Sequence, residues 1–258
     1  MKGVNLYAGR NFDILEEQDQ VRNMIKPSRH HTSLVLVLAA SILLLFSVKS
    51  KAEEVDLLLV LAMDVSSSVN YDEYGLQLNG YAEALRSPEV LKAVESGVHK
   101  KIAVLVTQWA GVEEQSILVD WTVLQTGGQL NALAETIEYS SRVFPYGGTA
   151  IAEALSHAHH QFGRSPHTAP RRVIDVSGDG KISIGAALEP VRDRILKTGV
   201  VINGLPILNE EQKLDDYYRR KLIGGIGSFV EHAEDFSSFR EALTRKLVRE
   251  IKGVWYGV

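Results

Sequence analysis

The sequence predicts an α/β fold, a doubly wound and mostly parallel central sheet with one antiparallel strand and helices on both faces. Along residues 53–258, apolar runs of strand length alternate with helical patterns, the order produced when crossover helices connect parallel strands. The run at residues 55–62 (VDLLLVLA) is apolar almost throughout, which is typical of a strand covered on both faces. We therefore expect this strand at the centre of the sheet.

The other elements follow from apolar runs, helical spacing and turn residues. Ser87-Pro88 separates two helical patterns, and a turn around Gly111 joins two neighbouring strands, which predicts that these two run antiparallel. Strands are expected over residues 55–62, 102–109, 116–121, 172–176 and 200–207, with a short edge strand over 228–231. Helices are expected over residues 74–85, 89–94, 128–141, 149–161, 185–197, 213–223 and 236–251.

The N-terminal region has the pattern of an export signal. Residues 34–48 (LVLVLAASILLLFSV) carry no charge, follow Lys26 and Arg29, and precede Ser50-Lys51-Ala52, a site suited to signal cleavage. This run is shorter than the roughly 17–25 residues of a spanning helix. We expect residues 1–52 to be an N-terminal extension and signal peptide, with Met24 as an alternative start, and residues 53–258 to be one domain. The protein would then be periplasmic or secreted; the alternative is a membrane anchor through residues 34–48.

Composition excludes several functions. The formal net charge is −4, which argues against a general nucleic-acid binder because such a protein needs a basic face. The chain contains no Cys, which excludes disulfides, thiolate zinc sites, iron–sulfur clusters and cysteine nucleophiles. Any metal ion must therefore be held by oxygen atoms or imidazole.

Carboxylates and hydroxyls gather where predicted strands end and a predicted helix begins. The first strand is followed by D-x-S-x-S, a later helix is preceded by Gly147-Gly148, and the fourth strand leads into S-G-D-G. In doubly wound sheets, ligands bind outside the carboxyl ends of the strands. Oxygen ligands of this kind suit Mg²⁺ or another hard divalent cation. The candidate metal ligands are Asp64, Ser66, Ser68, Thr149 and Asp179.

These motifs, in this order, resemble the metal-ion-dependent adhesion site of von Willebrand factor A domains. Over residues 54–252, and above all in the stretches VIDVSGDG, VINGLPIL and IGGIGSFV, the chain resembles the bacterial domain-of-unknown-function family 1194. The resemblance implies that Ser66, Ser68 and Thr149 are direct ligands of Mg²⁺, Mn²⁺ or Ca²⁺. It implies direct or water-mediated coordination by Asp64 and Asp179, although Ser177-Gly178 departs from the usual residues before that second Asp.

The resemblance also implies a binding module, in which the bound metal captures a carboxylate of a protein partner. One alternative is a structural envelope protein with a vestigial metal site. Another is a metal-dependent phosphoester hydrolase with Ser66 as the nucleophile. The sequence contains no G-x-S-x-G elbow and no P-loop, and no motif supplies a base for Ser66. We therefore expect no enzyme activity, no nucleic-acid partner, and membrane association only if residues 34–48 stay uncleaved.

Other polar residues have simpler interpretations. His157 and His160 share one face of a predicted helix and are interpreted as solvated histidines, with a Zn²⁺ or Ni²⁺ pair as the alternative. Asp175 lies inside a strand that should be buried, so it needs a partner. We expect that partner to be Arg171 or Arg172, with a supporting position near the metal as the alternative.

Overall fold

The computed structural model describes residues 52–253. The expected signal segment, with residues 34–48 and the alternative start at Met24, lies outside the described residues. Within residues 52–253, no helix is both long enough and apolar enough to cross a membrane.

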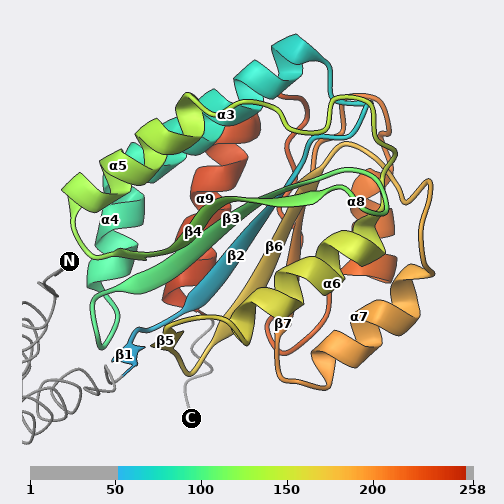
Figure 1. The fold of residues 1–258 in the computed structure, drawn as a ribbon. Helices are drawn as coiled ribbons and strands as arrows, with labels where there is room; N and C mark the ends of the chain where they lie inside the picture. Colours follow the sequence, from blue (N-terminus) through green and yellow to red (C-terminus); the bar gives the residue numbers. More distant parts are fainter. Residues whose placement is uncertain (1–51, 254–258) are drawn as a thin grey trace, which may run out of the picture. The chain divides into compact units, whose positions relative to one another are not determined.

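The central sheet has the order β4-β3-β2-β6-β7, and Figure 1 shows it between two layers of helices. Its strands are β2 (Leu58–Asp64), β3 (Ile102–Trp109), β4 (Gln115–Leu124), β6 (Arg172–Gly178) and β7 (Val201–Pro206). All pairs are parallel except β3 with β4. The predicted fold class is therefore confirmed, including the central strand and the antiparallel strand. A separate short pair joins β1 (Glu53–Glu54) to β5 (His167–Thr168).

The helices form one group on each face of the sheet (Figure 1). One face carries α3 (Tyr71–Arg86), α4 (Pro88–Glu95), α5 (Gly127–Glu138) and α9 (Phe239–Lys252). The other carries α6 (Ile151–Phe162), α7 (Leu188–Leu196) and α8 (Leu214–Tyr217). Ser87 ends α3 and caps α4, whose first residue is Pro88, so the predicted break is confirmed. Proline is favoured there because the first helical N–H has no partner inside the helix.

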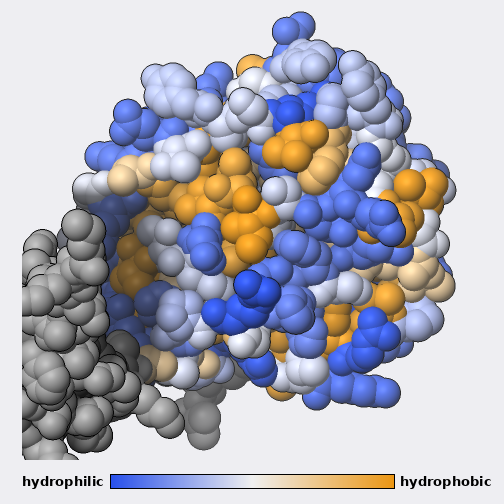
Figure 2. Space-filling view, viewed as in Figure 1, coloured by the Kyte–Doolittle hydropathy of each residue, from blue (hydrophilic) through white to orange (hydrophobic). Residues whose placement is uncertain are grey.

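Strand β2 supplies side chains to both hydrophobic cores. Leu59, Leu61 and Met63 pack under α3 and α9, whereas Val60 and Ala62 pack under α6. Successive side chains of a strand point to opposite faces, so a strand in the middle of the sheet must be apolar throughout. Edge strand β4 is mostly only half-buried. Figure 2 shows apolar residues gathered between β4 and α5, over the shallow groove lined by Val119, Val123 and Leu133.

Two expected elements differ in the structure. The expected strand over residues 228–231 is wrong, because Val230 makes only an isolated parallel bridge to Gly204. Gly225 and Gly227, with φ of 94° and 79°, turn the chain just before it, and this backbone conformation interrupts an extended segment. The expected helix over residues 213–223 continues past α8 as a π-helical turn, Tyr218–Leu222.

The expected partner of Asp175 is also wrong. Asp175 is fully buried, and its carboxylate lies 2.6 Å from the ammonium of Lys246, which comes from α9. Lys246 also lies 2.5 Å from Glu250. Arg171 donates instead to backbone carbonyls at the end of α9, and Arg172 donates to a backbone carbonyl in the loop before β7. Asp175 therefore belongs to a buried charge cluster that ties α9 to the sheet.

Candidate metal centre

The loop after β2 is held in place by backbone hydrogen bonds. The N–H of Val65 donates to the carbonyl of Trp109 at the end of β3, at 2.9 Å. The N–H of Ser67 donates to the carbonyl of Gly147, also at 2.9 Å. Inside the loop, the N–H of Ser66 donates to Oδ1 of Asp64 at 2.8 Å. The loop thus stands at the carboxyl end of the sheet, next to the segment that contains Thr149.

The structure brings four of the predicted ligand residues together through a chain of hydroxyl contacts, and Asp64 joins them through the backbone N–H of Ser66. The hydroxyl of Ser68 donates to Oδ1 of Asp179 at 2.7 Å. The hydroxyls of Ser66 and Ser68 lie 3.1 Å apart, and the hydroxyl of Thr149 donates to that of Ser66 at 3.4 Å. Asp64, Ser66, Thr149 and Asp179 are buried, whereas Ser68 is exposed. The group is therefore buried at its base and open to solvent at Ser68.

Both carboxylates have an oxygen without a partner. Among the described residues, Oδ2 of Asp64 and Oδ2 of Asp179 are buried and accept no hydrogen bond. Burial raises the pKa of Asp64 to about 8, and the nearby charge of Asp179 adds to this shift. Burial also raises the pKa of Asp179, and Glu73 acts in the same direction. An unpartnered buried carboxylate is costly, so this arrangement favours a bound cation.

Gly178 leaves room for Oδ2 of Asp64. A Cβ atom added at Gly178 would lie 2.6 Å from Oδ2 of Asp64 and 3.0 Å from the hydroxyl oxygen of Tyr218. Any larger residue at this position would push against the carboxylate. Gly178 is one of the two residues at which the sequence departs from the usual metal-site motif. Because glycine has no side chain, a small polar space remains beside Asp64.

Residues 54–255 match the model of a family described as "Protein of unknown function (DUF1194)". The chain belongs to this family. No curated protein sequence matches this DUF1194 protein.

The fold of this chain is similar to those of several solved structures, among them a von Willebrand factor type A protein. Proximal thread matrix protein 1 of the mussel byssus is 16% identical, with a TM-score of 0.58 over 79% of this chain and 50% of that one. A von Willebrand factor type A protein from Catenulispora acidiphila is 15% identical, with a TM-score of 0.53 over 76% and 43%. The pilus adhesin SpaC from Lactobacillus rhamnosus GG is 10% identical, with a TM-score of 0.55 over 76% and 31%. The chain spans half or less of the length of these proteins.

The donor set of the DUF1194 site fits a hard cation. Within residues 52–253, no group of three or more His, Asp or Glu side chains could hold a metal. Any ion at this site would therefore depend on the hydroxyls together with Asp64 and Asp179. Oxygen-only ligands with few charges match Mg²⁺, which usually keeps several waters. The histidines on α6 are engaged otherwise: the ring of His157 contacts the side chain of Gln161, and His160 is exposed.

Sequence reasoning missed two side chains that support this loop. Arg142 donates from Nη2 to the carbonyls of Val65, at 2.9 Å, and Ser66, at 2.6 Å. Gln77, buried on α3, donates to the carbonyl of Asp64 at 3.0 Å. All three acceptors are backbone oxygens of the loop or of the strand end before it, so no residue pattern in the sequence connects Arg142 or Gln77 to the site.

Replacing Arg142 with Ala should lower the free energy of unfolding by about 1–2 kcal/mol, since the loop loses donors to two carbonyls. The loop after β2 should also be held less firmly, so that the site binds Mn²⁺ several-fold more weakly. Calorimetric titration and thermal melts measure both effects. The matched control is Arg164→Ala at an exposed position, which should change neither. Equal behaviour of the two variants would contradict this role for Arg142.

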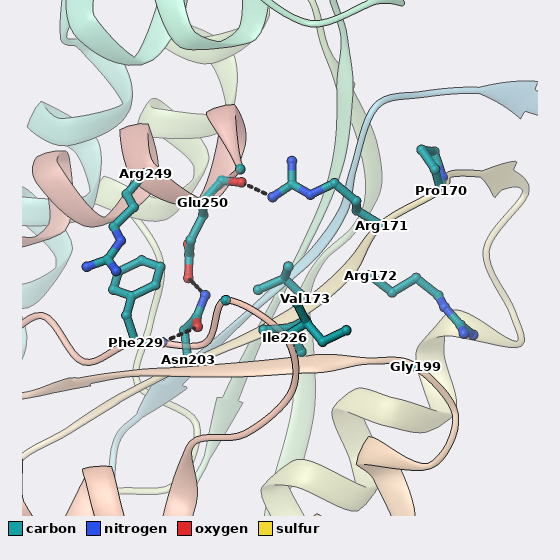
Figure 3. Close-up of a pocket in the computed structure, with 13 residues that line it drawn as sticks. Pro170, Arg171, Arg172, Val173, Gly199, Asn203, Ile226, Phe229, Arg249 and Glu250 are labelled. Atoms are coloured by element: carbon teal, nitrogen blue, oxygen red, sulfur yellow. Dashed lines mark hydrogen bonds between the residues drawn. The ribbon is translucent and has the colours of Figure 1, made fainter. Parts of the chain in front are cut away.

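A second polar cavity, at the amino ends of β6 and β7, has a volume of ≈ 160 Å³. Figure 3 shows that its arginines point in different directions: Arg171 toward the backbone of Glu250, Arg172 away from it, and Arg249 along the ring of Phe229. The guanidinium of Arg249 lies 3.8 Å from that ring centroid. Arg171 and Arg249 join α9 to the segments around it, whereas Arg172 donates to the carbonyl of Thr198 in the loop before β7. The three cations therefore do not converge on one ligand position.

Proposed function

We propose that this DUF1194 protein is an exported, divalent-metal-dependent protein-binding module that captures an acidic group of a partner. The observation that carries the proposal is the chain of hydroxyl contacts between the Asp64 loop, Thr149 and Asp179, beside two buried and unpartnered carboxylate oxygens. The ligands would be Asp64, Ser66, Ser68, Thr149 and Asp179, and the ion Mg²⁺, with Mn²⁺ or Ca²⁺ as alternatives.

The charge of the site explains why it would attract an acid. When bound, a divalent ion with only two protein carboxylates around it supplies an electrophilic position for a further oxygen ligand. Because Ser68 is an exposed residue, that position lies within reach of a partner. Two structural relatives give support: one is the byssus protein solved with a zinc-occupied MIDAS motif, at 16% identity, and the other is SpaC, a pilus adhesin.

Large exposed side chains on the segments next to the site support a protein partner. Tyr71 is 69% exposed and lies under the guanidinium of Arg142, and Tyr146 is 88% exposed and directly precedes the Gly147 carbonyl that holds the loop. Large exposed side chains of this kind are enriched at interfaces, where aromatic residues contribute most of the binding energy. The apolar rim consists of Tyr71, Val112, Val143, Tyr146 and Ile184.

The charges near the site restrict the partner further. Glu73 and Glu210 lie close enough to raise the pKa of Asp179. A dense run of acidic residues would be repelled by them. The partner that fits is a protein segment with a single carboxylate flanked by apolar residues.

A protein captured from an envelope extract should bind in Mg²⁺ and be released by a chelator. Asp179→Ala should abolish the capture because it removes a ligand. Tyr146→Ser should weaken it at least tenfold while leaving Mn²⁺ binding unchanged, since this residue lies on the rim and not among the ligands. Quantified capture by the full chain measures each effect. Capture that persists in chelator, or that Asp179→Ala leaves intact, would contradict the proposal. Turnover of a phosphoester panel would instead support the hydrolase.

A further inference from the structure

The hydroxyl of Tyr218 is buried without a partner near the candidate metal centre. Tyr218 is fully buried, and among the described residues its hydroxyl makes no hydrogen bond. It is the first residue of the π-helical turn Tyr218–Leu222. Such turns are rare and often occur at functional sites. A buried hydroxyl without a partner costs stability, so the Tyr218 hydroxyl does not serve to stabilise the fold.

Glycines on both neighbouring strands make room for this tyrosine. A Cβ atom added at Gly204 on β7 would lie 2.6 Å from the Tyr218 ring, at Cδ2. A Cβ atom added at Gly178, at the end of β6, would lie 3.0 Å from the hydroxyl oxygen. The ring therefore passes over Gly204, and the hydroxyl reaches the space beside Gly178.

That space is bordered by a donor and an acceptor that both lack a partner. The same Cβ position at Gly178 would lie 2.6 Å from Oδ2 of Asp64, which accepts no hydrogen bond in the described residues. A tyrosine hydroxyl carries a proton that it can donate to a carboxylate oxygen.

We propose that Tyr218 is a positioning residue of the metal site, whose hydroxyl holds Oδ2 of Asp64 across the space beside Gly178 when an ion is bound. This inference rests on the proposed function, because it assigns a role toward the same ion. Hydrogen bonds at binding sites are often long or misaligned without the ligand and tighten in the complex. Groups that orient metal ligands typically change metal affinity 10–100-fold when removed.

Tyr218→Phe separates this role from a structural one. In the metal-free full chain, the melting temperature should stay the same or rise, because an unpartnered buried hydroxyl is removed. Calorimetric titration with Mn²⁺ should show binding about tenfold weaker than in the wild type. Tyr217→Phe, which changes the neighbouring half-buried tyrosine, should leave the affinity unchanged.

Tyr81→Phe is the matched structural control. Tyr81 is also fully buried, but its hydroxyl is hydrogen-bonded to that of Ser177 at 2.9 Å. This variant should lower the melting temperature and leave the Mn²⁺ affinity within twofold of the wild type. The inference is overturned if Tyr218→Phe binds Mn²⁺ as the wild type does, or if it loses metal-free stability as Tyr81→Phe does. A wild type that binds no Mn²⁺ overturns the proposed function, and this inference with it.

Discussion

Replacing Lys246 with Met should lower the free energy of unfolding by about 3–5 kcal/mol, the usual cost of leaving buried charges without their partner. Lys246 is fully buried on α9 between the carboxylates of Asp175, at 2.6 Å, and Glu250, at 2.5 Å. Methionine keeps most of the side-chain volume but removes the cation that lies between two buried acids. Urea unfolding monitored by circular dichroism measures the loss.

Two further variants test this explanation. Lys252→Met, at the exposed end of the same helix, should cost less than about 1 kcal/mol, because there the charge interacts mainly with the helix dipole. Adding Asp175→Asn to Lys246→Met should recover part of the lost stability, since one unpaired charge is removed. A Lys246→Met protein as stable as the Lys252→Met protein would show that the buried cluster is not held by this lysine.

The same cluster predicts a pH dependence with a definite sign. Burial raises the pKa of Asp175 to about 7, and the charge of Glu250 adds to the shift, while Lys246 opposes it. A carboxyl group with a raised folded-state pKa contributes stability below its unfolded value of about 3.9 and loses that contribution as pH rises through about 7. The cost of Lys246→Met should therefore be larger at pH 8 than at pH 5.

The sequence was sufficient to predict the layers of the fold and the residues that meet at the candidate site. The run at residues 55–62 is apolar on both faces, and only a central strand buries both faces, so the position of β2 followed directly. Ser66 and Asp179 are far apart in sequence, but each lies at the carboxyl end of a strand or next to it. Parallel strands bring these ends to one edge of the sheet, and the two loops meet there through the hydroxyl of Ser68.

The supporting residues were not predictable because their partners lie in other elements or in the backbone. Asp175 was expected to pair with Arg171 or Arg172, but a strand is extended, so residues three or four positions earlier lie about 10 Å or more away along the chain. The face of Asp175 is covered by α9, and the register of that helix places Lys246 there. Arg142 and Tyr218 were not predictable for the same reason. Arg142 binds backbone carbonyls of the loop. Tyr218 packs over Gly204 from a π-helical turn that no sequence spacing indicated.

Divalent cations should stabilise the folded protein, and this stabilisation should depend on the proposed ligand Asp179. A ligand that binds only the folded state, at about 100 times its dissociation constant, adds roughly 2.7 kcal/mol. For a domain of this size, this is a rise in melting temperature of roughly 5–10 °C. Asp179→Asn keeps the acceptor for the Ser68 hydroxyl but removes a buried carboxylate whose charge raises the pKa of Asp64.

Asp179→Asn should therefore have opposite effects with and without metal. In chelator, its melting temperature should equal or exceed that of the wild type, because repulsion with Asp64 is gone. In millimolar Mg²⁺ or Mn²⁺, the rise seen in the wild type should disappear. His157→Ala, on α6 and bonded only to Gln161 among the described residues, should keep the full response. A wild type whose melting temperature ignores both ions would favour the vestigial site. A response lost in His157→Ala would place the ion elsewhere, because Asp64 and Asp179 would then not be its ligands.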